Sequence, residues 1–103
     1  MNECIHQMVD RIVDGFAPER IILFGSHARG QADSGSDVDL LVVMSISGSK
    51  REAAVAIAVA LHDIAVPKDV IVTTPEEFAW RKDVVGTVEW PAAHEGEVLY
   101  ARA

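Results

Sequence analysis

The sequence predicts an α/β domain in which a small β-sheet is flanked by helices on one or both sides. Some segments carry apolar residues at helical spacing, others are short β-branched apolar runs, and the two kinds alternate along the chain. The 103 residues, half of them apolar, are also enough to bury a core but suit only one domain, over 1–103.

The first half of the chain predicts a helix followed by two strands. Apolar residues at helical spacing indicate a helix over residues 2–14 that stops at Gly15. The run ERIILFGS is typical of a short buried strand ending at Gly25, and the following SHARGQ of a short helical turn. Residues 37–44, DVDLLVVM, are too apolar for an exposed strand, so we expect them in the middle of the sheet.

The second half predicts a helix over residues 50–64 and a strand over 68–73. Thr74, followed by proline and two glutamates, is a typical helix start. We expect one or two helices between residues 75 and 94, broken near Gly86 or Pro91, and a short final strand at EVLYA.

Two apolar stretches have alternative interpretations. The middle of the helix over 50–64, AAVAIAVAL, is apolar on every side, so it is either buried on several faces or available to a partner. The same alternatives hold for the apolar residues between Trp80 and Trp90, because tryptophan is common both in small cores and in interfaces.

Charge and composition exclude several classes of protein. With 9 basic and 16 acidic residues the net charge is −7, and no basic run is present, which argues against direct binding of nucleic acid. No segment approaches the ~20 apolar residues of a membrane span, and the N-terminal residues do not resemble an export signal, so we expect a cytoplasmic protein. Cys4 has no partner for a disulfide and is interpreted as a small hydrophobe.

Three features predict chemistry. Gly25-Ser26 is expected where a buried strand leads into a helix, so that glycine lets a ligand approach the backbone and the first free amides of the helix can bind an anion, although the pair alone also suits a plain turn. Asp37 and Asp39 project to the same face of a strand, about 7 Å apart, which suits a divalent cation; a solvated strand end with two exposed acids is the equal alternative for this pair alone. Asp69, at the start of the next strand, joins them if the two strands are neighbours; otherwise it is a surface acid.

The stretch LFGSHARGQADSGSDVDLLVV resembles the G-S-x10-D-x-D signature of the nucleotidyltransferase superfamily typified by DNA polymerase beta. It is most similar to the smallest branch, the minimal nucleotidyltransferases (MNT proteins), and the resemblance covers residues 19–73 well. The matching positions of their fuller pattern are Leu23, Phe24, Gly25, Ser26, Ala28, Arg29, Gly30, Ser36, Asp37, Asp39, Leu40 and Leu41.

The resemblance implies a small mixed sheet of the nucleotidyltransferase fold and a role for each matching residue. Gly25 and Ser26 match the pair that binds the triphosphate of ATP. Asp37 and Asp39 match two ligands of Mg²⁺, which the resemblance implies is bound as a pair of ions. Asp69 matches a third carboxylate ligand that also activates the acceptor hydroxyl. Arg29 either holds phosphate or braces the loop.

The resemblance also implies a partner. MNT proteins are commonly antitoxins paired with a HEPN ribonuclease toxin, and some transfer AMP from ATP to a tyrosine of that toxin. A chain of this length has little room for an acceptor pocket, so we expect a hetero-oligomer in which the toxin presents the hydroxyl. The alternative function is neutralisation by binding and occlusion alone. An antibiotic-modifying nucleotidyltransferase is a third interpretation, and the small size of the chain disfavours it.

Overall fold

The computed structural model describes residues 3–32 and 35–102, and the predicted first residue of the first helix, Asn2, lies outside them. The described residues form four helices and four strands. In chain order these are α1 (Glu3–Phe16), β1 (Arg20–Phe24), β2 (Val38–Val43), α2 (Lys50–Ala60), β3 (Lys68–Thr73), α3 (Pro75–Arg81), α4 (Glu89–Glu95) and β4 (Glu97–Ala101).

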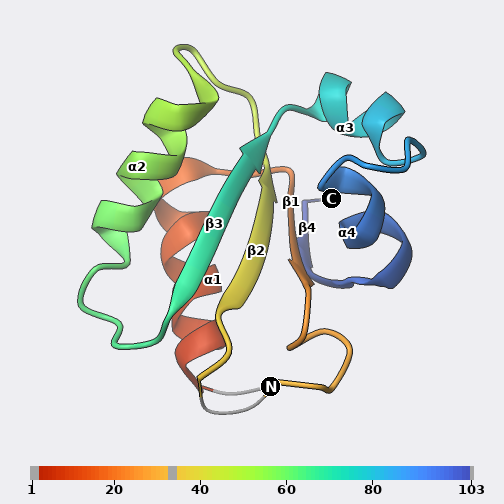
Figure 1. Ribbon diagram of the computed structural model, residues 1–103. Helices are drawn as coiled ribbons and strands as arrows, with labels where there is room; N and C mark the ends of the chain where they lie inside the picture. Colours follow the sequence, from red (N-terminus) through yellow and green to blue (C-terminus); the bar gives the residue numbers. More distant parts are fainter. Residues whose placement is uncertain (1–2, 33–34, 103) are drawn as a thin grey trace.

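The four strands form one mixed sheet in the order β3-β2-β1-β4 (Figure 1). β2 and β3 are parallel, with α2 in the connection between them, whereas β1 is antiparallel to both β2 and β4. The predicted fold class, a small mixed sheet flanked by helices, is therefore confirmed.

Helices pack on both faces of the sheet, and the residues of each strand alternate between the two faces. Leu40 and Val42 of β2 belong to the core cluster on the side of α1 and α2. Leu41 and Val43 belong to the second cluster, with Phe78 of α3 and with α4. All four of these β2 side chains are buried, which confirms that the strand is central.

The helix ends differ slightly from the predicted ones. α1 continues through Gly15 to Phe16 and ends where Ala17 adopts a φ of +48°. α2 begins with a capping box at Ser49 and ends at Ala60, with a turn in place of its predicted last residues. Within α2, Ile57 is the one fully buried residue of the all-apolar stretch; Leu61, which follows the helix, is buried too, whereas Val55 and Val59 are exposed to solvent.

The turn after β1 differs from the expectation. Residues 25–30 form hydrogen-bonded turns with no helix: the amide of Arg29 donates to the carbonyl of Gly25 at 3.2 Å, and that of Gln31 to Ser26 at 2.9 Å. The reason is the backbone of Gly25 and Gly30, whose φ angles of +75° and +71° lie in the left-handed region. The expected helix N-terminus behind Gly25 is therefore wrong, and a turn takes its place.

The segment after β3 contains two helices, where the sequence predicted one or two. Gly86, with a φ of +102°, lies between α3 and α4, whereas Pro91 lies inside α4. The predicted break near Gly86 is confirmed, and that near Pro91 is wrong.

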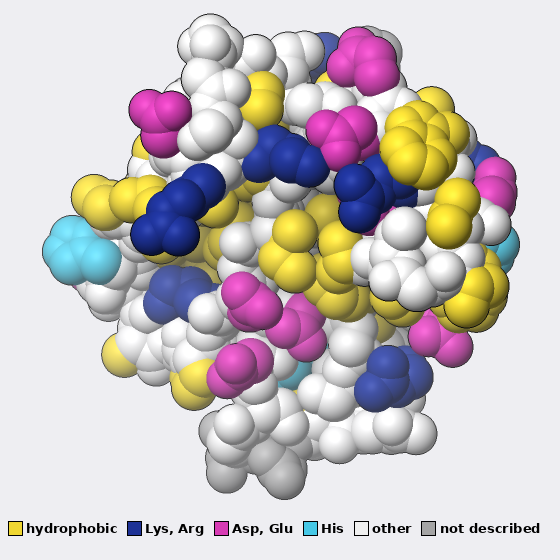
Figure 2. Space-filling view, turned by 45° about the horizontal axis from the view of Figure 1, so that its top comes forward, with side chains coloured by type: hydrophobic (Ala, Val, Ile, Leu, Met, Phe, Trp, Pro, Cys, Tyr) yellow, Lys and Arg dark blue, Asp and Glu magenta, His cyan; other side chains and the backbone are white. Residues whose placement is uncertain are grey.

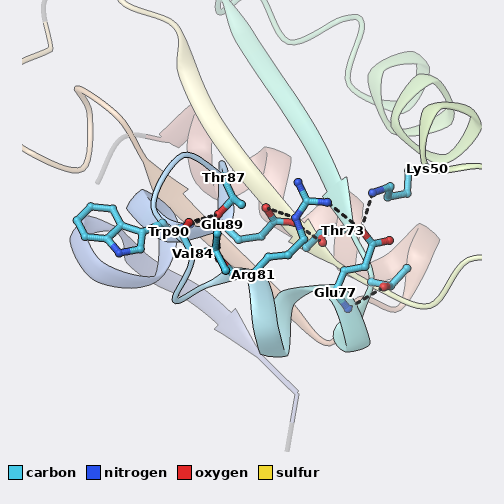
Figure 3. A network of polar contacts seen from close by, with 9 residues as sticks. Lys50, Thr73, Glu77, Arg81, Val84, Thr87, Glu89 and Trp90 are labelled. Carbon is cyan, nitrogen blue, oxygen red and sulfur yellow. Dashed lines mark hydrogen bonds and ion pairs between the residues drawn. The ribbon is translucent and has the colours of Figure 1, made fainter.

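A polar network with the buried residues Thr73 and Glu89 at its centre fixes α3 and α4 at the carboxyl end of β3 (Figure 3). The Thr73 hydroxyl donates to Oε2 of Glu89 at 2.8 Å, and Nε of Arg81 lies 3.3 Å from Oε1 of the same carboxylate. Glu77 accepts from Nζ of Lys50 at 2.8 Å and from Arg81 at 3.3 Å. The network thus connects β3 and three helices.

None of the helices in the described part of the chain is both long and apolar enough to span a bilayer.

Candidate active site

The acidic residues singled out in the sequence lie on one face of the sheet. Asp39 in β2 is the register partner of Asp69 in the parallel strand β3, so the two carboxylates project side by side. Asp37 precedes β2 by one residue and has the same parity as Asp39. Asp37 and Asp69 are exposed and Asp39 is half-buried. The structure therefore joins two acids separated by thirty positions, as expected if the strands were neighbours.

Gly25 packs directly against the carboxylate of Asp39. Its neighbour Phe24 is the register partner of Asp39 in the antiparallel strand β1. A Cβ atom at position 25 would lie 2.3 Å from Oδ2 of Asp39, and the φ of +75° disfavours any side chain there. Glycine is thus required for two reasons, and its presence brings the Gly25-Ser26 turn against the acidic group.

The three clustered acids, Asp37, Asp39 and Asp69, affect one another: the pKa of Asp39 is raised above its ordinary value. Burial is the largest cause, followed by the charges of Asp69 and Asp37. The charges of His27 and Arg29 act in the opposite direction. The acids are therefore incompletely balanced by the protein's own cations.

His27 is a site residue that was not predicted from the sequence. Nε2 of His27 donates to the carbonyl of Ser36 at 3.1 Å, which ties the turn after β1 to the segment that enters β2. The available signal was its position directly after Gly25-Ser26.

Arg29 lies in the same turn and is exposed. Its Nε donates to Oε1 of Gln31 at 3.3 Å, a contact within the loop. Its charge also acts on Asp39. The contact with Gln31 favours the bracing interpretation of Arg29, and its charge leaves it suited to attract an anion as well.

The donor set suits a hard divalent cation. Carboxylate oxygens are what Mg²⁺ prefers, and it is usually held by one or two carboxylates together with substrate phosphates. Within residues 3–32 and 35–102, no three His, Cys, Asp or Glu side chains form a ready-made cage for a metal ion. The pattern is that of an open site, in which a substrate would supply part of the coordination.

The face that carries these acids is open and mixed in character (Figure 2). Acidic side chains gather in the lower middle of the view, with apolar side chains above them and Lys and Arg side chains higher still. Ile71, two residues after Asp69 on this face, is half-buried and adjoins the second apolar cluster. The arrangement could hold a polyanion beside the acids when cations are present.

Comparison with known structures finds the same fold in several proteins. A chain of a toxin–antitoxin crystallised with AMP-PNP is 18% identical with a TM-score of 0.61, over 94% of this chain and 73% of that one. A putative nucleotidyltransferase from Sulfolobus solfataricus is 20% identical with a TM-score of 0.61, over 97% and 79%. A mutant of the toxin–antitoxin MntA–HpeT is 17% identical with a TM-score of 0.60, over 99% and 75%.

Among curated proteins, no sequence matches this chain. The family model of the nucleotidyltransferase domain does match, over residues 5–89. That range includes the turn after β1 and all three acids, and it covers most of the chain. The chain belongs to the nucleotidyltransferase domain family.

Proposed function

We propose that this protein is an antitoxin that transfers AMP from ATP to a hydroxyl group, that of a tyrosine, on a partner toxin of the HEPN ribonuclease type. The observation that carries the proposal is the pairing of Asp39 with Asp69 beside the Gly25-Ser26 turn, in a chain of the nucleotidyltransferase domain family. The similarity to toxin–antitoxin structures, one of them with AMP-PNP, supports the choice of nucleotide and of partner.

Asp37, Asp39 and Asp69 would hold Mg²⁺, which fits both their oxygen chemistry and the raised pKa of Asp39. When bound, the metal supplies neutralisation of the triphosphate and polarisation of the phosphoryl group under attack. The carboxylates in turn fix where this positive charge lies, at the amino ends of β2 and β3 next to the turn after β1.

The turn after β1 would bind the triphosphate. Gly25 has no side chain to keep a ligand from the backbone, and Ser26 adds a hydroxyl. Arg29 adds a positive charge on the same turn. His27 would hold the turn in place through its hydrogen bond to the carbonyl of Ser36.

Asp69, which is exposed, would accept the proton of the incoming hydroxyl. The hydroxyl oxygen forms a bond to the α-phosphorus, the bond from that phosphorus to the bridging oxygen breaks, and pyrophosphate leaves with the electron pair. Positioning of the two reactants and neutralisation of charge would account for most of the rate enhancement.

A second candidate function is neutralisation by binding alone. The observation that favours it is the exposure of large apolar side chains on α2 and around α3, where Val59, Trp80 and Val85 are 63%, 61% and 79% exposed. Such residues can anchor a partner whether or not transfer occurs. Loss of the acids separates the two candidates, because only transfer depends on them.

The test is the intact mass of a HEPN-type toxin co-expressed with the chain and then incubated with ATP and Mg²⁺. We expect an increase equal to one or more AMP groups with the wild type and none with Asp37→Ala/Asp39→Ala. As a matched control, Glu76→Ala/Glu95→Ala removes two exposed acids outside the site and should leave the modification unchanged.

Transfer would be refuted, and binding supported, if the Asp37→Ala/Asp39→Ala variant still neutralised the toxin and the toxin gained no mass with either the wild type or the variant. Loss of neutralisation together with loss of the mass increase would establish transfer to a protein acceptor.

A further inference from the structure

A groove of about 400 Å³ lies between α1 and β4, away from the acidic face. Its apolar lining comes from two half-buried residues on one side of α1, Val9 and Val13, and from Leu99 and Tyr100 of β4. All four pack against the edge of the core cluster that α1 and α2 share. The groove thus exposes apolar surface that continues the core of the domain.

The groove has the position that a third helix, beside α1 and α2, would occupy on this face of the sheet. α1 and α2 contact each other and cover the same face of the sheet. β4 is at the end of the strand order, and the groove lies over its part of this face, on the other side of α1 from α2. Val9 and Val13 are one turn apart, which gives the kind of ridge against which a neighbouring helix packs.

The rim of the groove is acidic. Asp10 and Asp14 are both exposed, lie one turn apart on α1 and line the groove together with His6. No lysine or arginine of the described part of the chain contributes to this lining. A complementary helix would therefore carry lysine or arginine residues one turn apart beside its apolar side.

We infer that this groove binds an amphipathic helix of a partner protein, with an apolar face on Val9, Val13 and Leu99 and a basic flank against Asp10 and Asp14. A second copy of the chain fits poorly, because it would bring an equal acidic rim and a net charge of −7 to the contact. The inference does not depend on the proposed transfer reaction, which uses the opposite face of the sheet.

The probe for this groove is a synthetic amphipathic peptide of about eighteen residues, long enough to be helical, with leucines on one face and lysines on its flank. A scrambled peptide of the same composition serves as its control. Both are titrated, without nucleotide or metal, into the ¹⁵N-labelled chain, and the amide shifts are followed. We expect saturable shifts at Val9, Asp10, Val13 and Leu99, and binding of the scrambled peptide at least tenfold weaker.

Charge reversal provides the second arm. Asp10→Lys/Asp14→Lys should weaken binding of the amphipathic peptide at least tenfold. Glu76→Lys/Glu95→Lys changes the net charge equally, at exposed positions outside the groove, and should leave affinity within twofold. Urea unfolding curves of both variants check that they are folded. The inference would be overturned by equal weakening in the two variants or by equal binding of the scrambled peptide. It would also be overturned by amide shifts centred on Asp37, Asp39 and Asp69, or by the absence of saturable binding.

Discussion

Replacement of Arg81 by methionine tests the buried polar network directly. The side chain of Glu89 is only 3% exposed, and Arg81 is its cationic partner at 3.3 Å. The atoms Nε and Oε1 are buried yet not aligned as a hydrogen bond, so the contact acts as an ion pair. In the variant, Glu89 would keep the hydrogen bond from Thr73 but would lose its counter-charge.

The expected loss follows from burial. Removal of one partner from a buried ion pair costs about 3–5 kcal/mol. Because 32% of the Arg81 side chain is exposed, water can partly replace it, and we expect a loss of about 2–3 kcal/mol in the free energy of unfolding. For a domain of this size each kcal/mol lowers Tm by roughly 4–8 °C.

The assay is urea unfolding followed by the fluorescence of Trp80 and Trp90. Arg51→Met serves as the control, since Arg51 is an exposed arginine on α2, and its replacement should change the free energy of unfolding by less than about 0.5 kcal/mol. Arg81→Met/Glu89→Met/Thr73→Val replaces the whole buried group by apolar side chains and should recover most of the loss. A loss in Arg81→Met no larger than in Arg51→Met would refute the reasoning.

The remaining predictions concern single carboxylates and one glycine. Since the folded-state pKa of Asp39 is raised, its ionisation opposes folding, and Asp39→Asn should stabilise the metal-free protein at pH 7. Unfolding curves at several pH values should show that this gain over wild type disappears as the pH falls through the folded-state pKa of Asp39. Asp63, whose pKa the hydrogen bond from Arg11 lowers to about 2, contributes stability above its ordinary pKa of 3.8 that is lost as the pH falls toward 2; Asp63→Asn should therefore flatten the dependence of Tm on pH in that window. Gly25→Ala should lower the free energy of unfolding by at least about 1–2 kcal/mol because of the left-handed backbone, and by less in an Asp39→Ala background, where the new Cβ no longer meets a carboxylate. Equal losses in both backgrounds would show that the contact between position 25 and Asp39 is unimportant.

Local patterns were sufficient to predict most elements and the acidic group. β2 and β3 each contain an apolar run with β-branched residues directly after an aspartate, and the parity of Asp37 and Asp39 places them on one face whatever the remaining fold. The position of Asp69 required one further assumption, that β3 neighbours β2, and the structure confirms it.

Features that depend on distant residues were not predictable from the sequence. Thr73 and Glu89 are sixteen positions apart, and no local pattern indicates that a glutamate near Gly86 becomes buried beside a threonine at a strand end. The turn after β1 was mistaken for the start of a helix because Gly25 was considered only for its approach to a ligand. Its contact with Asp39 depends on the antiparallel register of β1 and β2.

The parallel pairing of β2 with β3 also has a consequence for folding kinetics. β1 and β2 are joined by a shorter connection than the segment 44–67, which must fold and cross over before Asp69 can reach Asp39. Contacts distant in sequence carry a larger loop-closure entropy and form slowly, and here the closing step also brings like charges together. The third carboxylate is thus absent from any intermediate that lacks β3, so the chain acquires its complete acidic group only when this crossover closes.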